Sequence, residues 1–316
     1  AVSISKQVGK AVKLTWTRED DVRHDFYRVG GFQSVKGAVD KRGKLVAFED
    51  HFIGMHYNGR PVSGSRFSAS EFPLLNVDNA YASKTMFDIQ TPCGPWRAPG
   101  ANTTAFVVQS FLDELAHACG RDYLEFLLET MGEPRWFDVG NVRSLNTGRA
   151  AGVIRLAAEK AGWGRSLAKG RGLGLAFHFS HAGHIAEVAE VEVDEDKNLK
   201  VHKVVVAVDV GPIVNMSGAV SQVQGAVIDG LSTMAGQKIT MESGRIEQSN
   251  LHDYQVLRIP QAPLVEAHFI QSEDRPTGLG EPALPPLAPA VANAIFAANG
   301  DRVRKMPLTE EGYTLV

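Results

Sequence analysis

Three segments of the chain carry the pattern of a β-hairpin, and this limits the fold more than any other feature. Residues 32–50 place two runs rich in β-branched and apolar residues on either side of a turn at 40–43. Residues 188–208 repeat the pattern around a turn at 194–198, and residues 238–247 repeat it around Ser243-Gly244. A hairpin joins two antiparallel strands, and regular strand–helix–strand alternation is missing. We therefore predict an α+β fold with mixed, largely antiparallel sheets and packed helices.

Helical periodicity and capping residues mark the segments between these hairpins. The predicted helices are Ala1–Gly9, Ala105–Cys119 capped by Asn102 or Thr103, Tyr123–Met131 capped by Asp122, Arg149–Ala161 opened by Asn146 or Thr147, Ser217–Met234 with Asn215 as a candidate cap, and Leu287–Ala298. Val12–Thr17 alternates and predicts a strand. Gly and basic residues gather at 162–172, between a helix and a strand, and this is the best candidate for a boundary. We predict two α+β lobes, residues 1–165 and 166–316.

Composition excludes several classes of protein. The 316 residues are 44% hydrophobic and carry a formal charge of −3, so there is a core to bury and no basic excess for nucleic acid. No apolar run approaches the roughly 20 residues that span a bilayer. Cys93 and Cys119 are either a disulfide or two buried small apolar residues. Two cysteines are too few for an iron–sulfur cluster, which takes four thiolates, so an electron-transfer centre would have to lie on a partner.

A carboxylate is held on a stiff turn near the C-terminus, in the segment Gly278-Leu279-Gly280-Glu281-Pro282. Glycine lets a ligand come close to the main chain, while proline restricts its own φ and the residue before it. Glu281 stands between the two, directly before an apolar helix. A Glu among apolar neighbours can act as a general base. The alternative is a structural turn whose Glu caps the helix.

A second candidate site is the loop Trp96–Ala101, which lies directly before a predicted helix. The free N–H groups and the positive end of a helix suit an anion, and the planar fork of Arg97 can bind one. The alternative is an ordinary loop with a surface Arg.

Three histidines, His178, His181 and His184, form the rival metal signal. Zinc and copper both favour imidazole ligands. On one continuous strand, however, His178 and His184 would share a face and His181 would lie on the other. A role in lining an active site is therefore the alternative to a metal centre.

Four segments, taken in order, resemble the molybdenum hydroxylases, the family of xanthine dehydrogenase and aldehyde oxidase. Trp96–Ala101 resembles the family's aromatic-Arg-Gly cofactor loop, and Asp209-Val210-Gly211 with Ser221–Ala226 resembles its second cofactor segment. His252-Asp253-Tyr254-Gln255 resembles the run that precedes the catalytic Glu, and Gly278–Pro282 resembles the C-terminal signature. The likeness extends to Val12–Asp21 and covers nearly the whole chain. It is strongest to the isoquinoline 1-oxidoreductase beta subunit and membrane-bound aldehyde dehydrogenase branch.

The resemblance implies a role for each matching residue. Glu281 would be the catalytic base, and the cofactor would be molybdenum–molybdopterin in its cytosine dinucleotide form. The implied cofactor-binding residues are Trp96, Arg97, Ala98, Gly100, Ala101, Gln222, Gly225, Gly278, Leu279 and Gly280. No side chain would ligate the metal. For Gln222 the alternative is a helix residue that satisfies a neighbouring backbone group. Pro99 stands where family members often carry a second aromatic residue, which disfavours a purine-like substrate.

The family's Gly-Gly-x-Phe-Gly and Met-Gly-Gln-Gly loops are not found in this sequence. We therefore expect the C-terminal portion of a larger subunit, with a cofactor shared with the N-terminal portion of that subunit. The implied partners are that portion, an iron–sulfur subunit, and an aldehyde or heteroaromatic substrate. The family places such proteins in the periplasm or at a membrane, with the cytoplasm as alternative. Two other functions stay open: a non-catalytic fragment that docks without cofactor, and a His-based metal-binding module.

Overall fold

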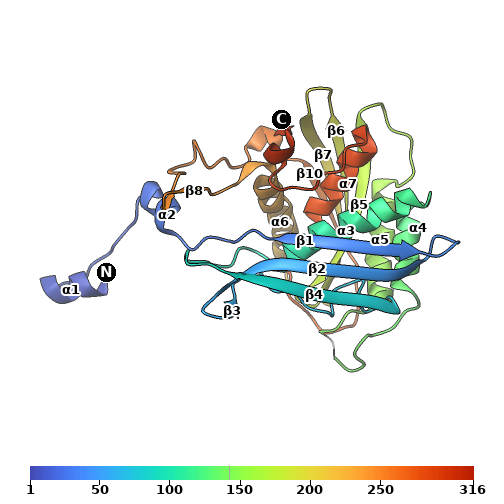
Figure 1. Cartoon of the computed structure of the whole chain (residues 1–316), viewed down its shortest axis with the longest axis horizontal. Helices are drawn as coiled ribbons and strands as arrows, with labels where there is room; N and C mark the ends of the chain where they lie inside the picture. Colours follow the sequence, from blue (N-terminus) through green and yellow to red (C-terminus); the bar gives the residue numbers. More distant parts are fainter. Residues whose placement is uncertain (142) are drawn as a thin grey trace.

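The computed structural model describes residues 1–141 and 143–316 and arranges them around two main β-sheets, with a third, two-stranded sheet beside them (Figure 1). The helices are α1 (Val2–Val8), α2 (Arg18–His24), α3 (Ala101–Ala118), α4 (Tyr123–Met131), α5 (Thr147–Ala161), α6 (Met216–Gly236) and α7 (Leu287–Asn299), with short 3-10 helices at Ile259–Gln261 and Leu308–Glu311. The strands are β1 (Phe32–Val39), β2 (Leu45–Tyr57), β3 (Arg60–Pro61), β4 (Asn79–Asp88), β5 (Arg171–Ser180), β6 (Gly183–Val193), β7 (Asn198–Asp209), β8 (Met241–Glu242), β9 (Arg245–Ile246), β10 (Leu264–Phe269) and β11 (Thr314–Leu315). Within these residues, no helix has both the length and the apolar character that a membrane span requires.

The two larger sheets mix antiparallel and parallel pairs. In the first, β2 pairs with β1 and β3 antiparallel and with β4 parallel. In the second, β5, β6 and β7 form an antiparallel meander, and β10 and β11 both join β7 in parallel. This confirms the predicted α+β class with largely antiparallel pairing.

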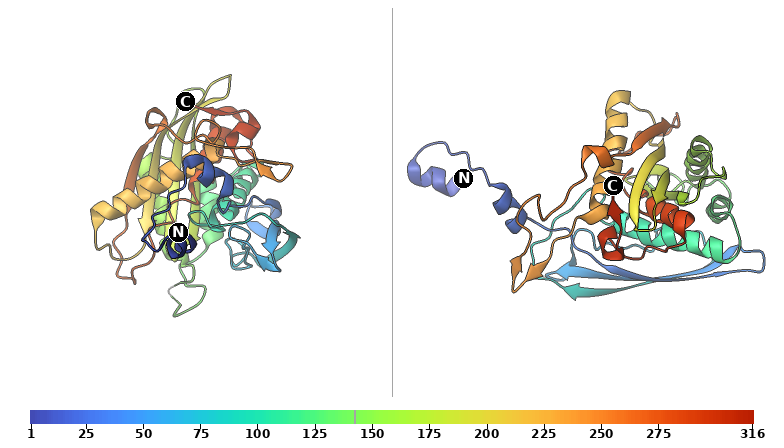
Figure 2. Two further views of the ribbon diagram at one scale, coloured as in Figure 1. Left: turned by 90° about the vertical axis from the view of Figure 1, so that its left-hand side faces the viewer. Right: turned by 90° about the horizontal axis from the view of Figure 1, so that it is seen from above.

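Helices separate the two sheets and cover both faces of the second one. One buried apolar cluster joins α3, α4 and α5 to β2 and to one face of β5–β7. The other joins α6 and α7 to the opposite face. Figure 2 shows α3 running beside the strands of the first sheet. At the edge of the second sheet, the Gln109 side chain of α3 accepts a hydrogen bond from the Phe177 amide. An edge strand with unpaired amides is prone to association, so α3 closes this edge.

The hairpin turns lie where the sequence predicts them, and in two of them an Asp side chain accepts hydrogen bonds from the backbone amides that follow it. Asp40 accepts bonds from the amides of Arg42 and Lys44, and Gly43 takes a left-handed φ of 78°. Asp194 accepts equivalent bonds from Asp196 and Asn198. An Asp that bonds the amides after it favours a tight turn. The predicted hairpin at 238–247 is present as the short pair β8 and β9.

Two local predictions are wrong, and three predicted caps are confirmed. Val12–Thr17 is not a strand: no described segment pairs with it, and Thr17 instead caps α2 in a capping box with Asp20. Asn102 and Thr103 do not cap α3, which begins at Ala101, because their side chains bind Arg28. The caps of α4, α5 and α6 at Asp122, Asn146 and Asn215 are confirmed.

The predicted lobes 1–165 and 166–316 stay a prediction, but the packing of α5 favours an earlier boundary. α5 lies in the first range, yet it packs on β6 and β7 of the second. Its Arg149 binds Asp209 at the end of β7 through Nη2 to Oδ1 at 2.6 Å. A division between α4 and α5 would keep this buried ion pair within one unit.

Cys93 and Cys119 are both free and half-buried, so the disulfide alternative is wrong.

Candidate functional site

Three segments far apart in the sequence meet at one place, and Arg97 joins them. It lies in the loop before α3, and its Nε donates to the Gly280 carbonyl at 2.6 Å. Its Nη2 donates to the Gln222 carbonyl at 3.0 Å and to Gln222 Oε1 at 3.2 Å, both on α6. The predicted cofactor loop, the start of α6 and the Gly278–Pro282 segment are thus bonded to one another. The fork of Arg97 is used by these protein groups, where the sequence suggested an anion.

Glu281 is tied to this meeting point through one carboxylate oxygen. Its Oε2 accepts a bond from the Ala98 amide at 3.1 Å and lies 2.7 Å from His181 Nε2. Ala98 is fully buried and takes a left-handed φ of 53°, a conformation that is uncommon outside glycine. This conformation places the Ala98 amide against Glu281. The Glu281 side chain keeps 41% of its surface exposed, and both of its partners among the described residues contact Oε2.

The electrostatic partner of Arg97 is Asp229, one helical turn beyond Gly225 on α6. Their nearest nitrogen and oxygen atoms lie 3.9 Å apart, and Trp96 Nε1 donates to the same carboxylate at 3.3 Å. Burial lowers the pKa of Arg97, while the charges of Asp229 and Glu281 oppose that shift. Burial also raises the pKa of Asp229, against the bond from Trp96 and the charge of Arg97. The site therefore holds one cation between two carboxylates at the edge of solvent.

A second arginine, Arg28, binds the backbone of the Trp96–Ala101 loop. The half-buried Arg28 donates to the Pro99 carbonyl at 3.1 Å and also bonds Asn102 and Thr103 in the first turn of α3. Asn102 in turn donates to the Arg97 carbonyl at 3.1 Å. Burial lowers the pKa of Arg28 to about 10, well above neutrality. A permanent cation thus fixes the shape of the 97–100 backbone.

The glycines of the site leave its surface open, which suits a large ligand close to the main chain. Gly225, Gly278 and Gly280 are all exposed. A Cβ at Gly225 would meet only Arg97 Nη1, at 3.7 Å, and one at Gly280 would meet only Gln222 Oε1, at 3.9 Å. Both positions therefore face space that protein does not fill. This open, glycine-lined surface fits a large cofactor close to the main chain, while the Arg97 charge is already balanced by Asp229 and Glu281.

The other predicted residues of the site fall into two groups. Trp96 and Leu279 are half-buried and pack on the α6–α7 cluster, so their visible role is to hold the segments in place. Ala101 is the first residue of α3. Gly100 has φ −87°, which any residue can adopt, but a Cβ there would lie 3.1 Å from the Arg66 carbonyl. The need for a small residue at Gly100 thus comes from Arg66.

The three histidines do not form a metal cluster, since no group of three potential ligands converges among the described residues. The prediction that His178 and His184 share a face is wrong. β5 ends at Ser180, so His184 lies on β6 opposite Phe179, the neighbour of His178, and the two rings point to opposite faces. Burial lowers the pKa of His178 to about 4 and that of His184 to about 3. Both are neutral at physiological pH. The third, His181, reaches Glu281.

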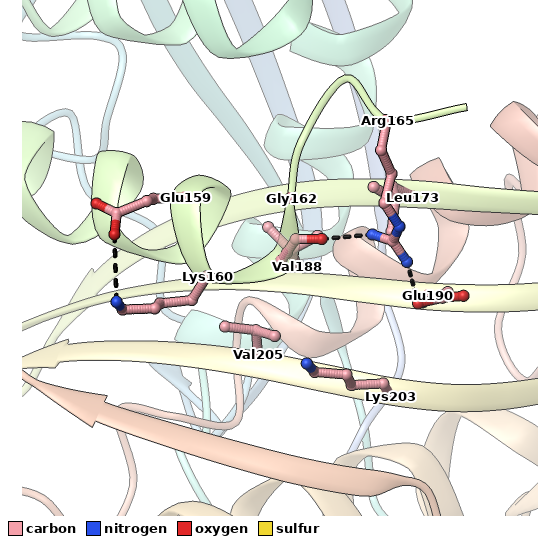
Figure 3. A pocket seen from close by; sticks show the side chains of 10 residues that line it. Glu159, Lys160, Gly162, Arg165, Leu173, Val188, Glu190, Lys203 and Val205 are labelled. Atoms are coloured by element: carbon pink, nitrogen blue, oxygen red, sulfur yellow. Dashed lines mark hydrogen bonds and ion pairs between the residues drawn. The ribbon is translucent and has the colours of Figure 1, made fainter. Parts of the chain in front are cut away.

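A cavity elsewhere in the molecule is a weaker candidate. It measures about 230 Å³ and lies where the end of α5 meets β5, β6 and β7 (Figure 3). Three cations at the cavity are already paired: Arg165 with Glu190, Lys160 with Glu159, and Lys203 with Glu266. With their charges neutralised by protein carboxylates, they offer little to an anionic ligand.

Sequence reasoning missed three residues of the site. Asp229 follows Gln222 and Gly225 at helical spacing i, i+3, i+7, a signal that was available. His181 was considered only as a metal ligand or a lining residue, because nothing local pairs it with residue 281. Arg28 carries no sequence signal, since its partners lie more than 70 residues away.

The fold and the converging segments define an α+β ligand-binding protein, and comparison with known families identifies the ligand. A family model described as a molybdopterin cofactor-binding domain matches residues 1–131, and a second model with the same description matches residues 148–263. The chain belongs to the molybdenum hydroxylase family, within its molybdopterin-binding large subunit.

Curated relatives match almost the whole chain but are much longer. A protein of Gluconacetobacter polyoxogenes named membrane-bound aldehyde dehydrogenase [pyrroloquinoline-quinone] is 31% identical over 95% of this chain and 42% of its own length. The isoquinoline 1-oxidoreductase subunit beta of Brevundimonas diminuta is 28% identical over 98% of this chain and 40% of its own. The chain thus spans about two fifths of the length of these relatives.

Solved structures confirm the fold. Quinoline 2-oxidoreductase from Pseudomonas putida 86 superposes with a TM-score of 0.83 over 97% of this chain and 64% of its own, at 12% identity. A Cu,Mo-CO dehydrogenase superposes with a TM-score of 0.79 over 97% of this chain and 64% of its own, at 11% identity.

Proposed function

We propose that this chain forms part of the active site of a molybdopterin-dependent oxidoreductase that hydroxylates an electron-poor carbon of an aldehyde or N-heteroaromatic substrate, with water as the oxygen source. The observation that supports this most is the junction made by Arg97, which brings the loop, α6 and Glu281 to one open surface. In this junction Glu281 is the catalytic base, and the ten residues named from the resemblance form or support the cofactor site.

The residues of the chain divide the work of such a site. When bound, the molybdenum cofactor supplies the redox chemistry, as cofactors do in general. Gly225, Gly278 and Gly280 admit it to the main chain, and Gln222 presents an exposed amide beside them. Glu281 takes the proton from the attacking water-derived oxygen at its open carboxylate oxygen. Its other oxygen stays bonded to the Ala98 amide, which holds the carboxylate in one orientation.

The remaining parts of the proposal concern what lies beyond this chain. The names of the relatives, an aldehyde dehydrogenase and an isoquinoline oxidoreductase subunit, support the substrate classes. We propose the cytosine dinucleotide form of the cofactor, shared with the N-terminal portion of the same subunit. We also propose an iron–sulfur subunit as electron acceptor, because this chain has only two cysteines.

The test is Glu281→Gln in the complete enzyme, which keeps the shape of the side chain and removes its basicity. General base catalysis contributes about 10²–10⁴-fold, so turnover should fall by at least 100-fold while the molybdenum content per protein is retained. Glu273→Gln is the matched control, since Glu273 is exposed on the same segment and bonds no described side chain. Turnover of Glu281→Gln near that of the control would refute the assignment.

A further inference from the structure

The turn between β5 and β6 is strained at two consecutive residues. Ser180 pairs with Gly183, so the turn has only His181 and Ala182 at its centre. Their φ angles are 53° and 62°, both in the left-handed region. A two-residue hairpin of this type normally carries Asn-Gly or Gly-Gly, because other residues meet a steric penalty there. Residues kept in such conformations often have a function that their side chain serves.

The strained position aims the His181 ring at Glu281. Its Nε2 lies 2.7 Å from Glu281 Oε2, although the two residues are 100 positions apart. Gly278, in the same segment as Glu281, lies against the turn, since a Cβ there would be 3.4 Å from His181 Cβ. The turn also packs on the residue after Glu281, since a Cβ at Gly183 would be 3.2 Å from the Pro282 ring.

The described hydrogen-bonding partners of the carboxylate meet at one of its oxygens, Oε2. The Ala98 amide bonds the same Oε2 as His181, and the Arg97 guanidinium, itself paired with Asp229, acts on Glu281 through its charge. Behind His181 lies the buried, neutral His178. Among the described residues, no group bonds Glu281 Oε1.

We propose that His181 is a positioning residue for Glu281: with the Ala98 amide it anchors Oε2 and turns Oε1 toward the substrate as the proton acceptor. This inference rests on the proposed role of Glu281 as the base. It assigns a function to the one histidine of the His178–His184 run that is exposed, and it explains why a histidine occupies a turn position that favours glycine.

The first experiment compares two replacements of His181 in the complete enzyme. His181→Gln keeps an N–H donor, whereas His181→Leu removes it at similar bulk. When a catalytic group is displaced by about 1 Å from its productive position, the rate of the reaction can fall by up to about 100-fold. We therefore expect His181→Leu to lower kcat about 10- to 100-fold with KM within about twofold, and His181→Gln to restore most of the loss. The molybdenum content should not change in either variant.

His202→Leu is the matched control for the loss of a histidine–glutamate contact. His202 Nε2 lies 2.8 Å from Glu192 on the β6–β7 hairpin, away from the site. This variant should keep the kinetic constants of the wild-type enzyme.

The second experiment separates positioning from turn structure. His181→Gly and Ala182→Gly each place a glycine at a left-handed position. In both variants the glycine relieves backbone strain in the folded chain and adds conformational entropy to the unfolded chain, so the two effects on the free energy of unfolding should be similar in the two variants. We expect similar urea midpoints for the two variants, with kcat lowered about 10- to 100-fold only in His181→Gly. Equal turnover in both would overturn the proposal, as would a His181→Leu enzyme with unchanged kcat.

The outcomes distinguish this inference from the proposed function. If Glu281→Gln abolishes turnover while His181→Leu does not lower it, only the role of His181 fails. If Glu281→Gln leaves turnover intact, the assignment of the base fails first and the proposal for His181 falls with it.

Discussion

At the scale of single residues, the site depends on Arg97 as a joint between segments. Its guanidinium bonds two carbonyl groups and one side-chain amide on two different elements. A lysine has the same charge but lacks the planar fork, so it can reach only one of these partners at a time. The positions of Gly280 and Gln222 relative to the loop would then be set by weaker contacts.

Arg97→Lys should therefore loosen the site while the rest of the fold remains. Hydrogen bonds from a charged group contribute about 1.5–3 kcal/mol each, so the loss of one of them should lower the free energy of unfolding by about 1.5–3 kcal/mol. The complete enzyme should also retain less molybdenum. Urea unfolding and metal analysis measure these two effects. Arg275→Lys, at an exposed residue of the neighbouring segment, is the control. A variant that matches the control in both would show that the loop is an ordinary connection.

A second residue-scale prediction concerns Glu71, near the first sheet. Burial and the neighbouring Asp50 raise the pKa of Glu71 to about 7. Asp50 is itself buried beside Gln33, and burial raises its pKa to about 6. Glu71 therefore binds a proton more tightly in the folded chain than in the unfolded one. Its contribution to stability is complete below pH 4.5 and is lost as the pH rises through about 7.

Glu71→Gln should remove the loss of stability at high pH, since glutamine stays neutral at every pH. One pKa unit corresponds to 1.36 kcal/mol, so the variant should be more stable than the wild type at pH 8 by on the order of 2–3 kcal/mol. At pH 4 the difference should nearly vanish. Denaturant unfolding at the two pH values measures it, with Glu195→Gln in an exposed turn as control. A pH-independent effect would mean that Glu71 does not titrate in this range.

At the scale of elements, helix α7 lies unusually close to strand β5. A Cβ at Gly174 would lie 2.1 Å from the Ala290 carbonyl oxygen, and one at Gly172 would lie 2.2 Å from that of Ala294. Gly172 and Gly174 thus serve helix–strand packing. Asn293 reinforces the contact by donating to the Leu175 carbonyl at 3.1 Å. The approach places the start of α7, and therefore Glu281 before it, against the second sheet.

Gly174→Ala should force these two elements apart. Overpacking in a core costs about 1–3 kcal/mol, and a backbone contact at this distance places the expected loss of unfolding free energy at the upper end or above. Gly152→Ala is the matched control, because a Cβ there would meet only Ile270 Cδ1, at 3.4 Å, inside a helix where alanine is favoured. That variant should be neutral or more stable by up to about 1 kcal/mol. Similar urea midpoints for the two variants would contradict the packing argument.

At the scale of the whole molecule, the chain presents surfaces that its own residues leave uncovered. Trp16, Phe26 and Phe32 are 51%, 68% and 72% exposed. Helix α1 has no buried residue and stands away from the body (Figure 1). The glycine-lined site is open as well, and the curated relatives are more than twice as long. These open surfaces agree with the proposal that the cofactor site is shared with the N-terminal portion of the same subunit.

The 316-residue chain by itself should therefore be inactive and hold little molybdenum. Small-molecule sites bury most of their ligand. If the rest of the subunit is missing, the pterin contacts only part of its binding surface and should bind weakly. Elemental analysis of the isolated chain, beside the complete enzyme, tests this. Near one molybdenum per chain in the isolated form would show that these residues bind the cofactor without help.

The sequence by itself determined the features that depend on neighbouring residues. Hairpin turns such as 40–43 and 194–198 follow from an Asp that bonds the amides just after it, and the caps at Asp122, Asn146 and Asn215 act within three residues. The family likeness was also readable, since each motif is a short run in a given order. Val12–Thr17 shows the limit, because alternation predicts a strand only if a partner strand lies beside it.

Only the tertiary structure decided what depends on groups distant in the chain. Arg97 bonds residues more than 120 positions away, and His181 meets Glu281 because a left-handed turn on one sheet faces the segment before α7. His178 and His184 point to opposite faces of the sheet because β5 ends between them. Gly172 and Gly174 of β5 have no space for a side chain because α7 packs against them. No local preference specifies such contacts. They arise when the two apolar faces of the β5–β7 sheet are buried under different helices, and that burial fixes which side chains share the open edge.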